Sequence, residues 1–95
     1  MPHQLLLYEY VDDVLARRTP HRDAHLAAIE RERSAGRLLV AGAYGDPPKG
    51  AAFVFSGVDA EHVHRFVRED PYVLADLVRS WRVEPYNAVV LPVAP

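Results

Sequence analysis

The residue best suited to move a proton is His25, which lies in a segment with the composition of a helix. By the three-and-four spacing rule, one side of that helix carries Arg22, His25, Leu26, Ile29 and Arg33. Leu26 and Ile29 are expected to face a sheet, and His25 beside them is expected to be at least partly buried. An imidazole can take up or release a proton near neutral pH. Periodicity alone, however, favours a simpler interpretation, a core histidine satisfied by one hydrogen bond.

A second candidate is Asp70, which follows Phe66 and Val67 at helical spacing and directly precedes Pro71. It is expected to point toward the sheet or its rim, at a helix end where the dipole disfavours negative charge. This placement makes Asp70 a candidate base. An aspartate before a proline is also a good cap for a following short helix, and one side chain can do both. Tyr72 adjoins this candidate base, although most such tyrosines are core or rim residues.

Other chemistries lack the residues that they need. The chain has no cysteine, which excludes disulfides, thiolate chemistry and cysteine-ligated metal. His21 and His25 are four positions apart and could chelate a metal on one helix face, but no third ligand is evident nearby. We therefore expect no metal and no cofactor. His62 and His64 point in different directions from one helix and are interpreted as surface residues.

The composition is typical of one globular domain spanning residues 1–95. Hydrophobic residues make up 49% of the chain and charged residues 25%, which argues against disorder. The net charge of -2 argues against a nucleic-acid partner. No apolar stretch is long enough to cross a membrane, and the first residues have no signal-like pattern. The cytoplasm is the expected location.

The elements that must position these side chains follow the order β-α-β-β-α-β. Strand composition marks residues 4–10, 37–44, 51–56 and 82–91. One helix is predicted from Thr19, as its cap, to Gly36, and a second from Asp59 to Asp70. A short third helix is predicted over residues 71–77. This order predicts a ferredoxin-like α+β fold, a four-stranded antiparallel sheet with helices on one face.

The strands predict a partner. With helices on only one face of the sheet, the other face should be polar and the strands should alternate. Instead, residues 5–8, 38–41 and 51–55 are apolar throughout. A bare apolar face would be an association site, and a second copy of the sheet is its simplest cover. We therefore expect a homodimer, with Leu5 or Leu7 in its core.

Several motifs occur in an order that resembles the YciI-like (YCII-related) family. They are Arg22-Asp23-Ala24-His25-Leu26, Gly36-Arg37-Leu38-Leu39, Ala41-Gly42, Asp70-Pro71-Tyr72-Val73 and Trp81-Arg82-Val83-Glu84-Pro85-Tyr86. The resemblance spans nearly the whole chain and implies a dimeric α+β barrel. It also implies a catalytic pair, which by position is His25 and Asp70, with Arg22 holding an anionic substrate or orienting the site. The sequence departs from the family at Asp76, where a glycine is common.

Two functions of different classes follow. The first is a small-molecule enzyme of lyase or isomerase type, similar to a dehydrochlorinase related to the family. In it His25 moves a proton, Asp70 orients or charges the imidazole, and Arg22 and Tyr72 contact the substrate. The alternative is a non-catalytic ligand-binding or accessory protein that uses the same cleft or surface. A more remote interpretation is a haem or metal protein with His25 or His21 as ligand.

Overall fold

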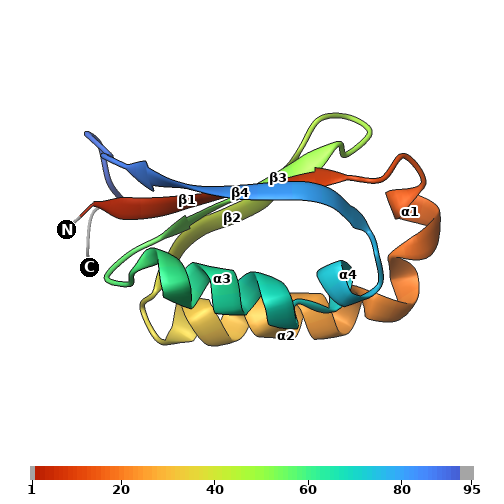
Figure 1. Ribbon diagram of the computed structural model, residues 1–95, viewed down its shortest axis with the longest axis horizontal. Coiled ribbons are helices and arrows are strands. Elements are labelled where there is room, and N and C mark those ends of the chain that lie inside the picture. The colour runs from red at the N-terminus through yellow and green to blue at the C-terminus, as the bar shows by residue number, and fades with distance from the viewer. Residues whose placement is uncertain (1, 93–95) are drawn as a thin grey trace.

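The chain folds into a four-stranded sheet that has all its helices on one side (Figure 1). The computed structural model describes residues 2–92. The strands and helices, in chain order, are β1 His3–Tyr10, α1 Val14–Arg17, α2 Thr19–Ser34, β2 Leu38–Tyr44, β3 Gly50–Phe55, α3 Ala60–Glu69, α4 Pro71–Leu74 and β4 Val78–Tyr86. All neighbouring strands are antiparallel, in the order β2-β3-β1-β4. The ferredoxin-like β-α-β-β-α-β prediction is confirmed, with α1 and α4 as short additions.

The prediction of the last strand at residues 82–91 is wrong, because β4 begins at Val78 and ends at Tyr86. Its first residues include charged and polar side chains that do not resemble a strand, but they pair with β1. The final pair joins Tyr86 to His3, where β1 starts, so the chain beyond has no strand to pair with. Pro85 lies on an edge strand, as predicted.

The N-terminal end of α2 also differs from the prediction. Thr19 is the first helical residue rather than the cap, and the cap position is occupied by Arg18 in a helical conformation with no side-chain capping bond. The reason is the unforeseen helix α1, which runs almost directly into α2. At the other end Gly36 has a φ of 76°, so the predicted left-handed terminator is confirmed.

Helices α3 and α4 both begin with aspartate caps. The Asp59 side chain accepts a hydrogen bond from the backbone N–H of His62, which confirms the predicted start of α3. Asp70 caps α4 in the same way. The predicted extent of α4 to residue 77 is wrong, because the helix ends at Leu74. Asp76 then adopts a φ of 60°, a conformation that glycine favours and aspartate tolerates.

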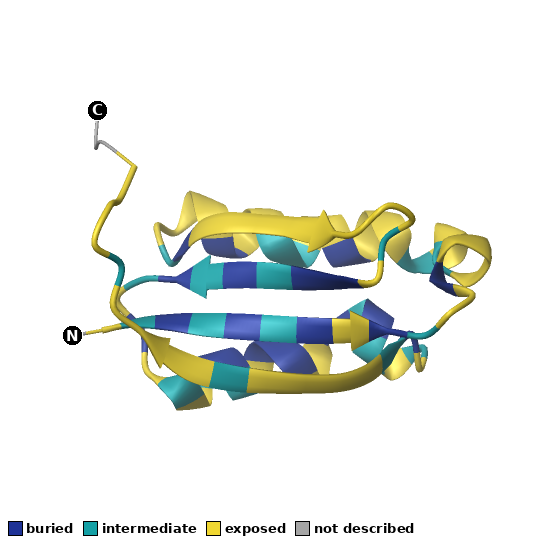
Figure 2. Cartoon of the chain, turned by 90° about the horizontal axis from the view of Figure 1, so that it is seen from above, coloured by how far each residue is buried: buried dark blue, intermediate teal, exposed yellow. Residues whose placement is uncertain are grey.

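The core lies between the sheet and α2 and α3. Seen from above, the two central strands alternate between buried and half-buried residues (Figure 2). On the helix side, the fully buried side chains include Leu6, Tyr8, Phe53, Phe55, Val63 and Val67. The expectation that Leu26 faces the sheet is wrong, since it is 43% exposed, whereas Ile29 packs against the core. No helix within residues 2–92 is long and apolar enough to span a membrane.

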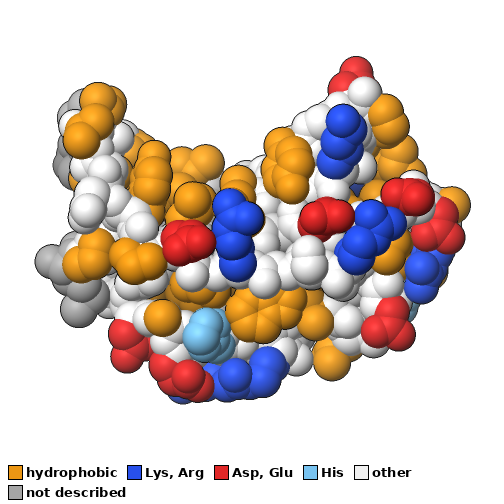
Figure 3. All heavy atoms as spheres, turned by 45° about the horizontal axis from the view of Figure 1, so that its top comes forward, with side chains coloured by type: hydrophobic (Ala, Val, Ile, Leu, Met, Phe, Trp, Pro, Cys, Tyr) orange, Lys and Arg blue, Asp and Glu red, His pale blue; other side chains and the backbone are white. Residues whose placement is uncertain are grey.

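The face of the sheet away from the helices is open; its two central strands present apolar side chains, and β4 places Glu84 beside Leu5 and Arg82 beside Leu7. The register places Leu5 opposite Val54 and Leu7 opposite Ala52, and all four are only half-buried. Figure 3 shows this face obliquely as a hollow, with hydrophobic side chains on both sides of it and acidic and basic side chains along its near edge. Both Leu5 and Leu7 therefore point away from the helices, and either can contribute to an association surface.

Candidate active site

His25 and Asp70 meet between α2 and the junction of α3 with α4, although 45 positions separate them in sequence. The Nδ1 atom of His25 lies 2.7 Å from Oδ1 of Asp70. Asp70 is 0% exposed and His25 is 5% exposed, so water does not compete for this contact. Helical spacing turns His25 inward, and Pro71 ends α3 so that Asp70 lies at the turn facing α2. The sequence-predicted pair is therefore in direct contact.

The Asp70 carboxylate accepts two further hydrogen bonds. Its Oδ1 accepts from the backbone N–H of Tyr72 at 3.0 Å, and its Oδ2 accepts from the hydroxyl of Tyr8 at 2.7 Å. The first of these bonds is the cap of α4, so the capping role and the contact with His25 coexist. An ionised carboxylate only accepts, which assigns the proton of the shared bond to Nδ1 of His25. Three donors thus hold Asp70 in one orientation.

Tyr8 is a member of this site that the sequence reasoning missed. Burial raises its pKa far above the ordinary range, and the charge of Asp70 and the hydrogen bond to it act in the same direction. The hydroxyl therefore remains protonated and remains a donor. A signal was available in the sequence, because Tyr8 shares the helix-facing side of β1 with Leu6 and a buried hydroxyl needs a partner.

Tyr72 lies flat against His25. The two rings are 3.7 Å apart between centroids and only 5° from parallel, so the tyrosine covers one face of the imidazole. Tyr72 is buried, and this burial raises the pKa of its hydroxyl. With Nδ1 bonded to Asp70 and one face covered by Tyr72, the imidazole has a single orientation.

The His25 cavity, as we call it, opens beside this pair. It has a volume of about 120 Å³, and its lining includes Tyr10, Arg18, Arg22, His25, Ala41 and Tyr72. Within residues 2–92, every fully buried side-chain nitrogen or oxygen has a hydrogen-bond partner. Nε2 of His25 has no partner there. Nε2 is therefore not fully buried and keeps contact with solvent. The ring thus presents Nδ1 to Asp70 and Nε2 outward, as a general acid or base requires.

The sequence predicted Arg22 as a residue of this site, and the structure adds Arg18 and Tyr10 to the lining of the cavity. Arg18, Arg22 and His25 follow one another at spacings of four and three, so the same helical rule could have identified Arg18. Burial raises the pKa of Tyr10 to about 12, with smaller contributions from Tyr72 and Asp70, so its hydroxyl also stays neutral. No cluster of three or more potential metal ligands occurs within residues 2–92.

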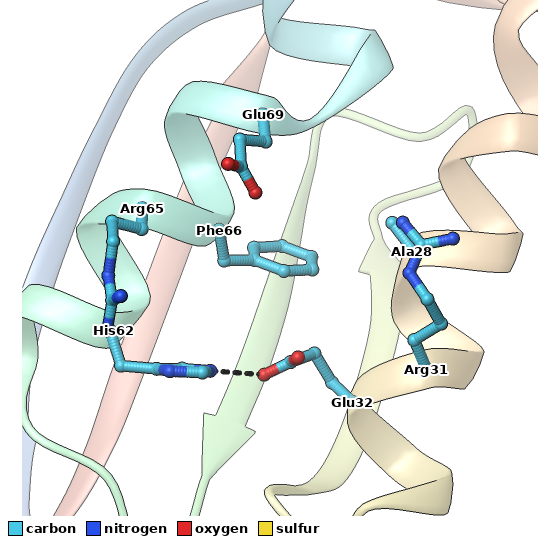
Figure 4. Close-up of a pocket in the computed structure, with 7 residues that line it drawn as sticks. All are labelled: Ala28, Arg31, Glu32, His62, Arg65, Phe66 and Glu69. Carbon is cyan, nitrogen blue, oxygen red and sulfur yellow. Dashed lines mark hydrogen bonds and ion pairs between the residues drawn. The ribbon is translucent and has the colours of Figure 1, made fainter.

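The other helical histidines lie elsewhere. His62 is half-buried rather than a free surface residue, because its Nε2 lies 2.5 Å from Oε1 of Glu32 (Figure 4). Arg37 bonds both oxygens of the same carboxylate. These hydrogen bonds, first that from Arg37 and then that from His62, lower the pKa of Glu32. The groove beside them, between α2 and α3, has a volume of about 190 Å³ and is separate from the His25 cavity.

Replacing Glu32 by glutamine should destabilise the protein in a pH-dependent way. Because the pKa of Glu32 is lower in the folded state, its contribution is fully present above the unfolded value of about 4.3 and is lost as pH falls through the folded value. We expect a loss of about 1–2 kcal/mol at neutral pH that shrinks below about pH 4. Urea denaturation of both proteins across pH measures this difference.

Glu30→Gln is the matched control, because Glu30 lies on the same helix and pairs with Arg33 at the exposed surface. It should change stability little at any pH. A Glu32→Gln variant as stable as the parent at neutral pH would contradict the assigned contribution of the Arg37–Glu32–His62 network.

The fold and this site together define a class, small ferredoxin-like α+β proteins with a buried histidine–carboxylate pair beside a cavity. The YCII-related domain family matches residues 1–87, and the chain belongs to this family. No curated protein sequence matches it.

The solved structures that resemble the chain include the following two. The 5-chloro-2-hydroxyhydroquinone dehydrochlorinase of Burkholderia phenoliruptrix, in complex with 2,5-dihydroxybenzoquinone, is 24% identical with a TM-score of 0.76; the match covers 90% of this chain and 93% of that one. A protein of Agrobacterium tumefaciens is 12% identical with a TM-score of 0.60, and the match covers 99% and 100% of the two chains. At these identities the likeness shows the fold.

Proposed function

We propose that this chain is a small-molecule enzyme of lyase or isomerase type in which His25 transfers the proton. The observation that carries the proposal is the 2.7 Å contact between Nδ1 of His25 and Oδ1 of Asp70, which leaves Nε2 at a cavity. Asp70 holds the ring and stabilises the imidazolium that forms when Nε2 takes a proton. Arg22 and Tyr72 line the same cavity and would contact the substrate.

The chemistry that this arrangement supports begins with removal of a substrate proton by Nε2. The electron pair left behind forms a new double bond. In an elimination, a leaving group on the neighbouring atom departs with its bonding electrons. In an isomerisation, Nε2 returns the proton to another atom of the conjugated system.

The activity of the dehydrochlorinase that shares this fold offers a direct test. The chain is incubated with 5-chloro-2-hydroxyhydroquinone, and chloride release is measured. In parallel, one-ring keto and enol acids in deuterium oxide report proton exchange by NMR. We expect turnover in at least one assay that is lost in His25→Gln. If the activity of the parent protein does not exceed that of the His25→Gln variant in any assay, the enzyme proposal is wrong. The alternative, a ligand-binding protein without catalytic activity, would then be favoured.

We further propose that the chain works as a homodimer joined through the open face of the sheet. Apolar residues gather on this face, and Leu5 and Leu7 at its centre are only half-buried in one chain. Dimers of this kind cover an apolar face that would otherwise contact water. Light scattering at micromolar concentration should give twice the chain mass of 10.7 kDa.

Replacing Leu7 by lysine should break this dimer. In a single chain the lysine amine can reach water from its half-buried position, whereas a covering sheet would bury the charge without a partner. We expect a folded monomer by light scattering and circular dichroism. Leu74→Lys is the control, since Leu74 lies on α4 and is 69% exposed. A Leu7→Lys variant that stays dimeric would place the interface elsewhere.

A further inference from the structure

The His25 cavity carries two guanidinium groups. Arg18 and Arg22 both line it. Within residues 2–92 neither forms an ion pair with a carboxylate. Asp70, the carboxylate of the site, is fully buried, and its two oxygens are occupied by three donors. The cavity mouth therefore has an excess of positive charge, which favours an anionic ligand.

Both arginines line the cavity together with His25 and Tyr72. Burial raises the pKa of the Tyr72 hydroxyl, and the charges of Arg18 and Arg22 oppose this rise, so both guanidiniums lie near that hydroxyl. The ring of Tyr72 in turn is stacked on His25. An anionic group held by the arginines would thus place the rest of its molecule beside Nε2.

The opposite wall of the cavity is made of small side chains. Ala41 pairs with Phe53 and Ala43 pairs with Ala51 in the sheet register, so these alanines share the helix side of the sheet. Their methyl groups leave a volume of about 120 Å³. A protein cavity of about 150 Å³ is known to take benzene, so this volume matches about one ring. The aromatic rings of Tyr10 and Tyr72 favour a flat ligand.

We propose that the ligand of the His25 cavity is a planar conjugated oxyanion of at most one ring, held by Arg18 and Arg22 and limited in size by Ala41 and Ala43. A carboxylate and an ionised enol or hydroxyquinone share this chemistry, since both spread a negative charge over coplanar oxygens that guanidinium groups bind. This inference rests on the proposed function and names its substrate class. Arg18 and the alanine wall are the specificity-determining elements that it adds.

Benzoate is the probe that tests this class, with benzamide as its neutral isostere and 2-naphthoate as its two-ring analogue. Calorimetry measures affinity, and the NMR signal of the His25 ring reports the place of binding. We expect benzoate to shift that signal and to bind about tenfold or more tightly than benzamide, with no shift from 2-naphthoate. Equal binding of benzoate and benzamide, or no shift with benzoate, overturns the proposal.

Three variants locate the determinants. Arg18→Met and Arg22→Met should each weaken benzoate binding by about tenfold or more, because each removes a charge-assisted contact. Arg17→Met is the control, since Arg17 bonds Asp13 and the Ala75 carbonyl outside the cavity. Ala41→Leu should abolish benzoate binding while the fold persists, because Ala41 is exposed to the cavity rather than packed in the core. Unchanged affinity in both arginine variants contradicts the assignment.

These measurements separate the ligand class from the catalytic proposal because benzoate binding needs no turnover. His25→Gln should still bind benzoate. Binding of benzoate without turnover of any substrate would contradict the proposed enzyme activity and support the anion site. Turnover confined to neutral substrates would contradict the anion site and support the proposed enzyme activity.

Discussion

His25→Gln is expected to lower kcat/KM by about 10²–10⁴-fold for any substrate that the protein turns over. This range is the usual contribution of a positioned general acid or base. Glutamine has a similar reach and can still bond Asp70, but it cannot exchange a proton near neutral pH. The loss should fall mainly on kcat, because the arginines that we propose to bind the substrate are unchanged. Steady-state kinetics on the parent and the variant measure it.

His21→Gln is the matched control for this substitution. His21 lies one turn earlier on α2 and does not line the His25 cavity. Its replacement should leave kcat/KM within about twofold, because it has no contact with the proton-transfer pair. Equal losses in the two variants would mean that the effect comes from α2 as a whole, and His25 would then have no special role.

Asp70→Asn is expected to cause a loss of similar size, about 10²–10⁴-fold in kcat. The amide keeps the shape of the carboxylate but removes the negative charge that stabilises the imidazolium, and it can impose the wrong tautomer on His25. The same change of aspartate to asparagine in the Ser-His-Asp triad of serine proteases costs about 10⁴-fold in kcat. The NMR signals of the His25 ring should differ between Asp70→Asn and the parent. Identical signals would mean that the 2.7 Å contact has no chemical consequence.

This variant should also be less stable, because the amide cannot accept from all three donors that surround Asp70. The expected decrease in the free energy of unfolding is about 1–3 kcal/mol. Asp59→Asn is the control, since Asp59 is also a helix cap and asparagine caps as well as aspartate. Asp59→Asn should be nearly as stable and as active as the parent. This result would show that the losses in Asp70→Asn do not come from the loss of a capping charge alone.

Much of the site followed from local patterns. The spacing of Arg22 and His25 along one helix and the position of Asp70 before Pro71 both follow from rules that act over a few residues. The stack of Tyr72 on His25 and the bond from Tyr8 to Asp70 did not follow, because each joins segments that lie far apart in the chain. Which tyrosine meets which carboxylate depends on how the helices lie across the sheet.

The errors in the fold have the same origin. The segment that opens β4 has charged residues and looks unlike a strand, and only its pairing with β1 decides otherwise. Pairing also decides where β4 ends, because its last residue Tyr86 pairs with His3, the first residue of β1. Thr19 has the chemistry of a cap, but α1 leads so directly into α2 that the cap position passes to Arg18.

By itself, the sequence determined the order of the elements, the left-handed turn at Gly36, the aspartate cap at Asp59 and the residue types available for proton transfer. These features depend on backbone conformation and short-range spacing, which neighbouring residues dictate. The tertiary structure decided that His25 and Asp70 touch, that Tyr8 completes the carboxylate's bonds and that Arg18 faces the cavity. Those contacts form only when the helices pack on one face of the sheet, because packing and burial bring distant side chains within hydrogen-bond range.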